Sequence, residues 1–353
     1  LQVPMAPAYL DENPENFTSY PYDDDGSGPC NLTVRGFNPL GLTITYMLVF
    51  VFSTVGNGVV VWVVCWIAKR RTSTDIYLTH LAAANLLFGL TLPFWAVDAR
   101  SGWIFGTALC KLLSGLQEAS EYGGVFLLAC ISVDRHLAIV KATRVKSSHG
   151  PVVKATCAAV WLVAAVLSIP TAVQRRHMGT EDPDRDICYE DVMDESSNRW
   201  YVLMHIARHV LGFFLPLAVM AVCYGSTLVT LYHTHNRQKQ KAIRVIVAVV
   251  LAFIVCWLPY NVVLLIQLLI QSSLVEVESC GTRDRVWVAL DVTKVLAFVH
   301  CAVNPVLYAF IGVKFRNQLL SVAHKWGLVG SRLVATYRGS SASSGGSARS
   351  RNT

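Results

Sequence analysis

The stretch from Cys110 to Ile139 limits what this chain can fold into more than any other feature. Its residues are almost all apolar between a cysteine at one end and an Asp134–Arg135 pair near the other. As an α-helix with a rise of about 1.5 Å per residue, the 25 steps from Cys110 to Arg135 would cover roughly 37 Å. That exceeds the roughly 30 Å hydrocarbon core of a bilayer, so we expect the two ends at opposite membrane interfaces. A helix that touches both compartments is suited to carry information across a membrane.

Other apolar runs of spanning length accompany this one. With it, the expected spans are 41–68, 76–98, 108–139, 153–173, 201–231, 243–271 and 286–311. The composition agrees, because 53% of the residues are hydrophobic and only 15% are charged, against about 25% charged in soluble domains. The sequence therefore predicts an all-α membrane protein, a seven-transmembrane helix bundle with its termini on opposite sides. No internal repeat is visible, which argues against many transporter folds.

The pattern of charges divides the chain into four expected parts. These are an extracellular, acidic, glycosylated tail (1–39), the bundle (40–312), a short amphipathic juxtamembrane helix after the seventh span (313–330) and a disordered, Ser-rich cytoplasmic tail (331–353). Lys and Arg gather at 69–71, 141–154, 237–244 and 314–316, which places these loops in the cytoplasm. The N-terminus is then outside and the C-terminus inside a multi-pass plasma-membrane protein. The glycosylation sequons at Asn16 and Asn31 fit this orientation.

The expected outer side is acidic although the chain has a net charge of +7. The first 34 residues hold six carboxylates and no Lys or Arg, and the loop 174–199 holds eight more. The negative electrostatic field of these carboxylates attracts positively charged partners, which favours a basic ligand. Tyr20 and Tyr22 lie beside Asp23, Asp24 and Asp25, where tyrosine sulfation would add charge; ordinary tail tyrosines are the alternative.

The ten cysteines fall into two groups. Six lie within apolar spans and are expected to be small buried hydrophobes. The other four, Cys30, Cys110, Cys188 and Cys280, allow three pairings. No Cys/His spacing fits a zinc site, and no nucleophile–base arrangement is visible. We therefore expect no metal, no cofactor and no enzymatic activity.

Several polar side chains interrupt the spans. Asn57 and Asn85 are expected to form hydrogen bonds across helices, because an unpaired polar group in a membrane is costly. Glu118 and Glu121 share one helical face, and so do Asp291 and Lys294. We expect Lys294 to pair with one of these glutamates, either within a ligand pocket or as a structural salt bridge.

Basic and hinge residues follow in the later spans. His205, Arg208 and His209 would add positive groups to the same pocket. Pro259 and Pro305 should weaken their helices as hinges.

Short motifs resemble those of a known family. Gly56-Asn57, Asp134-Arg135-His136, Trp161, CWLP (256–259) and NPVLY (304–308), with Cys110 and Cys188, resemble a rhodopsin-like (class A) G-protein-coupled receptor over 40–327. TLPFWAVD (91–98), WIFGTALCK (103–111), LLACISVDRHLAIV (127–140) and AVVLAFIVCWLPYN (248–261) are similar to the CXC chemokine receptors, and most to the interleukin-8 receptors.

The resemblance implies both structure and partners. It implies the disulfides Cys110–Cys188 and Cys30–Cys280, basic CXC chemokines as ligands, and an inhibitory heterotrimeric G protein inside. Receptor kinases and arrestin would act on the Ser-rich tail, the amphipathic helix would contact membrane lipids, and no nucleic acid is expected.

Site residues follow from the resemblance together with the spacing. The expected ligand-binding residues are Tyr20, Tyr22, Asp23, Asp24, Asp25, Trp95, Asp98, Glu118, Glu121, Arg208, Asp291 and Lys294. The expected coupling and switch residues are Asp134, Arg135, His136, Tyr224, Lys241, Phe253, Trp257, Pro259, Asn304, Pro305 and Tyr308. Asp134 would hold Arg135 in the resting state, and its release would open a cleft for the G protein.

Three positions depart from the family pattern. Most members have Asp where Asn85 stands and Tyr where His136 stands, and chemokine receptors usually have Glu where Lys294 stands. Asn85 removes the carboxylate that binds sodium in the resting core, and Gly124 supplies no hydroxyl ligand. We expect Asn85 to bond Asn304 instead, and the receptor to signal without ligand. Virus-encoded homologues show similar departures, so a viral origin stays open.

Two other functions compete with a signalling receptor. A decoy that captures chemokines without activating a G protein would not need the intact Asp134–Arg135 and NPVLY motifs. A transporter or channel could use Glu118, Glu121 and Lys294 as a polar path, but no broken-helix pair supports it.

The acidic tail is predicted to speed the association of a basic chemokine. Changing Asp23, Asp24 and Asp25 together to Asn should chiefly slow chemokine association, because long-range attraction sets the on-rate. The effect should shrink as added salt reduces the Debye length below about 10 Å. Stopped-flow or surface-binding kinetics at low and high salt measure it. An unchanged on-rate at low salt would refute the role of the tail.

Overall fold

Long helices make up nearly all of the described structure. The computed structural model describes residues 39–67, 72–140, 150–179, 186–191, 195–234, 237–272, 275, 279–311, 313–327 and 329–330. Its helices are α1 (Pro39–Trp62), α2 (Ser73–Ser101), α3 (Gly106–Val140), α4 (Gly150–Gln174), α5 (Glu195–His209), α6 (Leu215–Thr234), α7 (Arg237–Gln271), α8 (Cys280–Ile311) and α9 (Val313–Lys325). Each expected span coincides with one or two of these helices, and α5, α7 and α8 each begin six residues earlier than predicted.

Two π-helical segments extend this arrangement. Val63–Ile67 continues α1, and Val210–Phe214 joins α5 to α6, so that the two helices form one span. A π-helical turn inserts one residue into the helical repeat and rotates the side chains that precede it. Nothing in the hydrophobic pattern predicted either segment.

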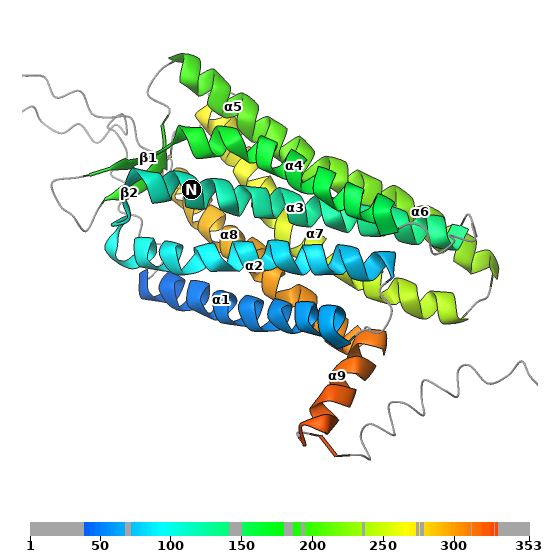
Figure 1. The fold of residues 1–353 in the computed structure, drawn as a ribbon. Helices are drawn as coiled ribbons and strands as arrows, with labels where there is room; N and C mark the ends of the chain where they lie inside the picture. Colours follow the sequence, from blue (N-terminus) through cyan, green and yellow to red (C-terminus); the bar gives the residue numbers. More distant parts are fainter. Residues whose placement is uncertain are drawn as a thin grey trace, which may run out of the picture.

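The helices form one bundle (Figure 1). Six of the described helical runs are long and apolar enough to cross a membrane. The remaining long helix, α3, has 35 residues and carries Glu118, Glu121, Asp134 and Arg135, which lower its hydropathy. It packs against α2, α4 and α6 and is the seventh member of the bundle. The two glutamates face Arg208 of α5, which removes the need for lipid to solvate them.

The two ends of the bundle differ (Figure 1). At one end, strands β1 (Arg175–Met178) and β2 (Ile187–Glu190) form an antiparallel hairpin, in which Arg175 lies opposite Glu190. At the other end, the short helix α9 leaves the bundle axis at a steep angle and contacts the segment that continues α1. We refer to these as the hairpin end and the α9 end.

Local sequence explains several helix boundaries. Thr72 caps α2 through a capping box, because its hydroxyl accepts the Asp75 N–H while the Asp75 carboxylate accepts the Thr72 N–H. Gly102 ends α2 at a φ of 72°, a conformation that favours glycine. Pro259 and Pro305 lie inside α7 and α8, which continue through them.

Gly56 generates a prediction about packing. A Cβ atom at this position would lie 2.9 Å from Cβ of Pro305, which is too close, whereas a Cβ at Gly58 would meet nothing within 4 Å. Gly56→Val should therefore force α1 and α8 apart and destabilise the protein by about 1–3 kcal/mol. Thermal unfolding in lipid nanodiscs measures the change, with Gly58→Val as the matched control. Equal unfolding temperatures for the two variants would contradict this account of the helix contact.

Candidate functional site

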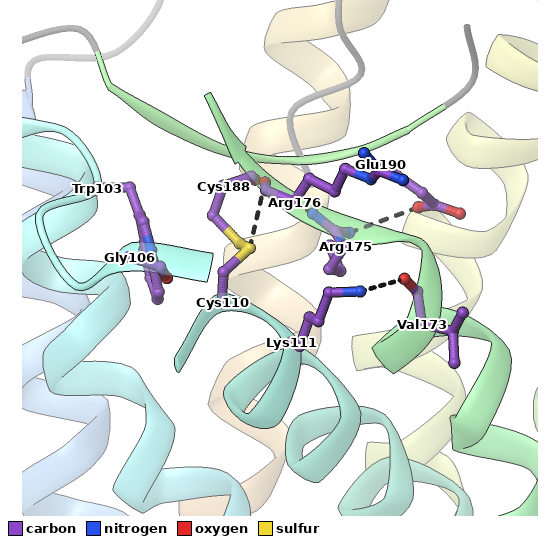
Figure 2. Close-up of a disulfide and its surroundings, with 9 residues drawn as sticks. All are labelled: Trp103, Gly106, Cys110, Lys111, Val173, Arg175, Arg176, Cys188 and Glu190. Carbon is purple, nitrogen blue, oxygen red and sulfur yellow. Dashed lines mark hydrogen bonds and ion pairs between the residues drawn. A yellow bond between two sulfur atoms is a disulfide. The ribbon is translucent and has the colours of Figure 1, made fainter. Parts of the chain in front are cut away.

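A disulfide fastens the hairpin to the start of α3 (Figure 2). Cys110 pairs with Cys188 across 78 residues of sequence, which confirms that pairing. A hydrogen bond also links α3 to the end of α4, directly before the hairpin. The Lys111 ammonium donates to the Val173 carbonyl at 2.6 Å. The hairpin is thereby held over the end of the bundle. The second expected disulfide stays a prediction, because Cys30 lies outside the described residues.

Three ionisable side chains are buried where the hairpin meets α5: Arg175, Glu190 and His205. Arg175 lies 3.6 Å from the Glu190 carboxylate, and the His205 imidazole of α5 lies 3.6 Å from its other oxygen. Burial by itself would raise the pKa of Glu190, but the polar contact with His205 and the charge of Arg175 outweigh it and lower the pKa to about 2. This cluster connects the hairpin with α5.

A second buried cluster joins α3 to α5. The Arg208 guanidinium lies 3.0 Å from Glu121 and 3.7 Å from Glu118. The expected pairing of a glutamate with Lys294 is therefore wrong. The guanidinium fork can reach two carboxylates at once, whereas the Lys294 ammonium lies 5.9 Å from the centre of the Phe298 ring.

Two neighbouring cavities adjoin the second cluster. The deep cavity is lined by residues of α2, α3, α5, α7 and α8, with Glu121 and Trp257 among them, and its empty space of about 730 Å³ includes space open to solvent. The rim cavity has about 410 Å³ of empty space on the same basis and lies closer to the hairpin, with Arg175 in its wall. Glu118 and Arg208 line both cavities. Glu118 and Arg208 therefore lie between a rim cavity lined mainly by polar residues and a deep cavity with a more apolar wall.

Some of the expected ligand-binding residues line the two cavities and others do not. Trp95, Glu118, Arg208 and Lys294 line the rim cavity, and Glu118, Glu121 and Arg208 line the deep one. Asp98 and Asp291 line neither. The tail residues Asn16, Tyr20, Tyr22, Asp23, Asp24, Asp25 and Asn31 lie outside the described residues.

Aromatic rings connect the deep cavity to the middle of the bundle. Trp257 lies with its ring centre 6.3 Å from that of Phe253 and 6.4 Å from that of His300. Phe253 and His300 are themselves 5.6 Å apart. A ligand that displaces Trp257 would therefore disturb α7 and α8 together.

The core between α1, α2 and α8 is polar and neutral. The Asn85 amide donates to Oδ1 of Asn57 at 3.1 Å, and Asn57 donates to the Cys301 carbonyl at 2.9 Å. The cross-helix bonding of both residues is confirmed, but the expected bond from Asn85 to Asn304 is wrong. Asn85 instead meets Asn57, because α1 and α2 pack closely along their length. Asn304 is fully buried, and its amide has no hydrogen-bond partner among the described residues.

At the α9 end, Arg135 pairs with its neighbour. The guanidinium lies 2.7 Å from the Asp134 carboxylate, which also accepts a hydrogen bond of 3.3 Å from Thr74 of α2. The expected Asp134–Arg135 contact is confirmed, and both side chains stay partly exposed.

Two more expected switch residues lie on the facing α3 and α6. Tyr224 shares a 2.7 Å hydrogen bond with Ser132, and His136 lies 3.3 Å from the Thr227 hydroxyl. Lys241 and Tyr308 lie in α7 and α8, with side chains outside the described set.

Sequence reasoning missed Arg175, Glu190, Ser132 and His300. Arg175 and Glu190 belong to an expected loop, and their only signal is that they flank a segment containing Cys188. Ser132 and His300 carry no signal, because a small hydroxyl or a single imidazole in a span is usually structural.

A model of the rhodopsin family of seven-transmembrane receptors matches residues 56–308. The chain is 44% identical over 334 residues to C-X-C chemokine receptor type 1 of Pan troglodytes and to that of Homo sapiens, covering 94% of each chain. It is 43% identical over 321 residues to C-X-C chemokine receptor type 2 of Macaca mulatta, covering 89% of this chain and 90% of the relative.

The Glu190 cluster predicts a pH dependence. The folded-state pKa of about 2 lies below the ordinary 4.5, so the ionised carboxylate stabilises the hairpin above about pH 4.5. That stabilisation should be lost as the pH falls from 4.5 towards 2. Hydrogen-exchange protection of β1 and β2 across this range measures it.

Glu190→Gln should abolish this dependence. Asp191→Asn is the matched control, because Asp191 pairs at 2.8 Å with Arg176, whose side chain is 62% exposed. A pH profile that is the same in Glu190→Gln and in the parent would contradict the assignment to Glu190.

Proposed function

The chain belongs to the rhodopsin family of seven-transmembrane receptors, and on that basis we propose that it binds CXC chemokines outside the cell and activates heterotrimeric G proteins, of the inhibitory class, inside it. The observation that carries the proposal is the identity of 44% over 94% of the chain to a C-X-C chemokine receptor type 1. The protein is then a receptor of the plasma membrane and not an enzyme. The relatives reported above are mammalian, so a viral origin is not part of the proposal.

Ligand capture is proposed in two stages. The acidic tail attracts the basic body of the chemokine, and the N-terminal segment of the chemokine then enters the rim cavity. Trp95, Glu118, Arg208 and Lys294 line that cavity. Asp98 and Asp291 do not line that cavity, and we propose that they contact the ligand as it enters. The hairpin is tied to α3 by Cys110–Cys188 and is suited to support the bound chain.

Signal transfer is proposed to run along α3, α7 and α8. Ligand in the cavities would displace Trp257 against Phe253, and Pro259 and Pro305 would act as hinges. Arg135 would then leave Asp134, and Tyr224 would leave Ser132, to open a cleft between α3, α6 and α7. His136, Lys241, Asn304 and Tyr308 complete the proposed coupling residues.

The remaining partners are proposed from placement. Receptor kinases and arrestin would act on the Ser-rich tail, which lies outside the described residues. Helix α9 would lie on the inner leaflet, because the exposed Trp326 at its end packs against Trp62 with ring centres 5.6 Å apart. Glycosylation at Asn16 and Asn31 belongs to the same outer-tail proposal.

Guanine-nucleotide exchange in membranes tests the function. The receptor is expressed with an inhibitory heterotrimer, and exchange is measured with and without a panel of CXC chemokines. Chemokine-dependent exchange supports the proposal. High-affinity binding of a chemokine without any exchange would instead identify a decoy, and no binding by any member of the panel would refute both functions.

Arg135 is predicted to be essential for activation of the G protein. Arg135→Ala should abolish nucleotide exchange and leave chemokine binding at the cell surface largely intact, because the residue lies near the C-terminal end of α3 and lines neither cavity. Lys154→Ala removes an exposed cation from the neighbouring α4 and should retain exchange. Normal exchange by Arg135→Ala at matched surface level would show that this helix end does not gate the G protein.

A further inference from the structure

Two side-chain hydrogen bonds, one helical turn apart, join α3 to α6. Ser132 and Tyr224 share the first at 2.7 Å, and in the second Nδ1 of His136 lies 3.3 Å from the Thr227 hydroxyl. His136 follows Ser132 by four residues and Thr227 follows Tyr224 by three, so both bonds lie on the facing sides of the two helices. The second bond is the one nearer to the C-terminal ends of both helices.

The direction of the second bond follows from the single proton of the Thr227 hydroxyl. The hydroxyl donates this proton to the Cys223 carbonyl of its own helix at 2.6 Å. It can then only accept a hydrogen bond from His136. We therefore assign the proton of the neutral imidazole to Nδ1, which makes His136 the donor across the two helices.

The first bond has the same form. The Ser132 hydroxyl donates to the Leu128 carbonyl at 2.8 Å, so it accepts the Tyr224 O–H. In both bonds, a hydroxyl that is already satisfied within its own helix accepts a donor from the facing helix. Breaking either bond leaves that hydroxyl with a partner, which avoids the cost of an orphaned buried hydroxyl. Bonds of this kind hold two helices together and can still be released.

The two donors differ in their access to water. Tyr224 is buried, whereas the His136 side chain is partly exposed. Water can therefore replace the Thr227 hydroxyl as the partner of His136 when the bond opens. His136 also follows Arg135 directly in α3. A movement of the C-terminal part of α6 away from α3 would break this bond next to the proposed gate of the G protein.

We propose that His136 is a positioning residue, whose bond to Thr227 holds α6 against α3 in the resting receptor and must be released on activation. The inference rests on the proposed function and deepens it, because it gives this coupling residue a restraining role. Loss of the bond should then favour the open arrangement without ligand. A neutral hydrogen bond of ordinary strength shifts such an equilibrium roughly twofold to tenfold.

Basal nucleotide exchange of the full-length receptor, measured in membranes with an inhibitory heterotrimer at matched surface level, tests the proposal. His136→Phe keeps a ring of similar size and removes the Nδ1–H group, so basal exchange should rise roughly twofold to tenfold. The chemokine-stimulated maximum should be retained, because Arg135 is unchanged. His136→Asn places an amide N–H close to the position of Nδ1 and should return basal exchange towards the parent value. Equal basal exchange in the parent and in His136→Phe would overturn the proposal.

The partner residue gives an independent test of the same bond. Thr227→Val keeps the shape of the side chain and should raise basal exchange as His136→Phe does. The double variant should show no more than either single change, because both remove one interaction. Additive increases would overturn the shared bond. Ser226→Ala removes a hydroxyl from the neighbouring, exposed position of α6 and should leave basal exchange unchanged. If His136→Phe does not reach the surface, Thr227→Val decides.

Amide hydrogen exchange separates this restraint from the receptor function. It is measured for the part of α6 that follows Tyr224, in lipid nanodiscs without chemokine or G protein. His136→Phe should speed it, and His136→Asn should bring it back towards the parent rate. Faster hydrogen exchange with unchanged basal nucleotide exchange, in a receptor that responds to chemokine, would make the bond merely structural and overturn the proposal. No nucleotide exchange by the parent or any variant, with any chemokine of the panel, would instead refute the receptor function itself.

Discussion

A charge inside a membrane protein is stable only where another group compensates it, and this requirement decides how the hairpin end is built. Arg208 draws Glu118 and Glu121 of α3 towards α5. His205 of α5, three residues before Arg208, lies 3.6 Å from Glu190 of the hairpin. Removing one partner of such a cluster would leave a buried charge exposed to an apolar environment, at a cost of about 3–5 kcal/mol. The ion pairs therefore fix which helices meet, and the cavities form around them.

Helix α3 connects this end to the other. Cys110 at its start is held to the hairpin by the disulfide, and Arg135 near its end is held by Asp134. Between them lie the glutamates of the deep cavity and Ser132, which bonds Tyr224. A displacement near the hairpin has a direct mechanical route to the α9 end, because one continuous helix carries all of these contacts.

The sequence predicts the bundle well, because the length and apolar character of a span follow from bilayer thickness alone. It also predicts that Glu118 and Glu121 share a face, since helical spacing determines that. It does not predict their partner. Lys294 and Arg208 both offered a positive charge, and the choice depends on helix rotation, to which the π-helical segment Val210–Phe214 contributes.

The same limit applies to the hydrogen bonds of the core. A buried amide must find a partner, which the sequence predicts for Asn57 and Asn85. Which helix supplies the partner depends on interhelical distance, which no periodicity encodes. Arg175 and Glu190 were missed for a related reason, because a strand of four residues in a loop leaves almost no pattern.

The polar core is neutral, and we expect this property to affect the resting state more directly than any other. Asn85 bonds Asn57 without any need for a cation, and Gly124 brings no oxygen ligand, so sodium has no carboxylate to bind at this position. A shift of about 1.4 kcal/mol in the resting equilibrium changes the active fraction roughly tenfold.

Basal nucleotide exchange in sodium and in potassium buffer, for the parent and for Asn85→Asp at matched surface level, tests this directly. The account predicts ligand-free exchange in the parent that is equal in both buffers and lower in Asn85→Asp. Parent exchange no higher than that of empty membranes would contradict it.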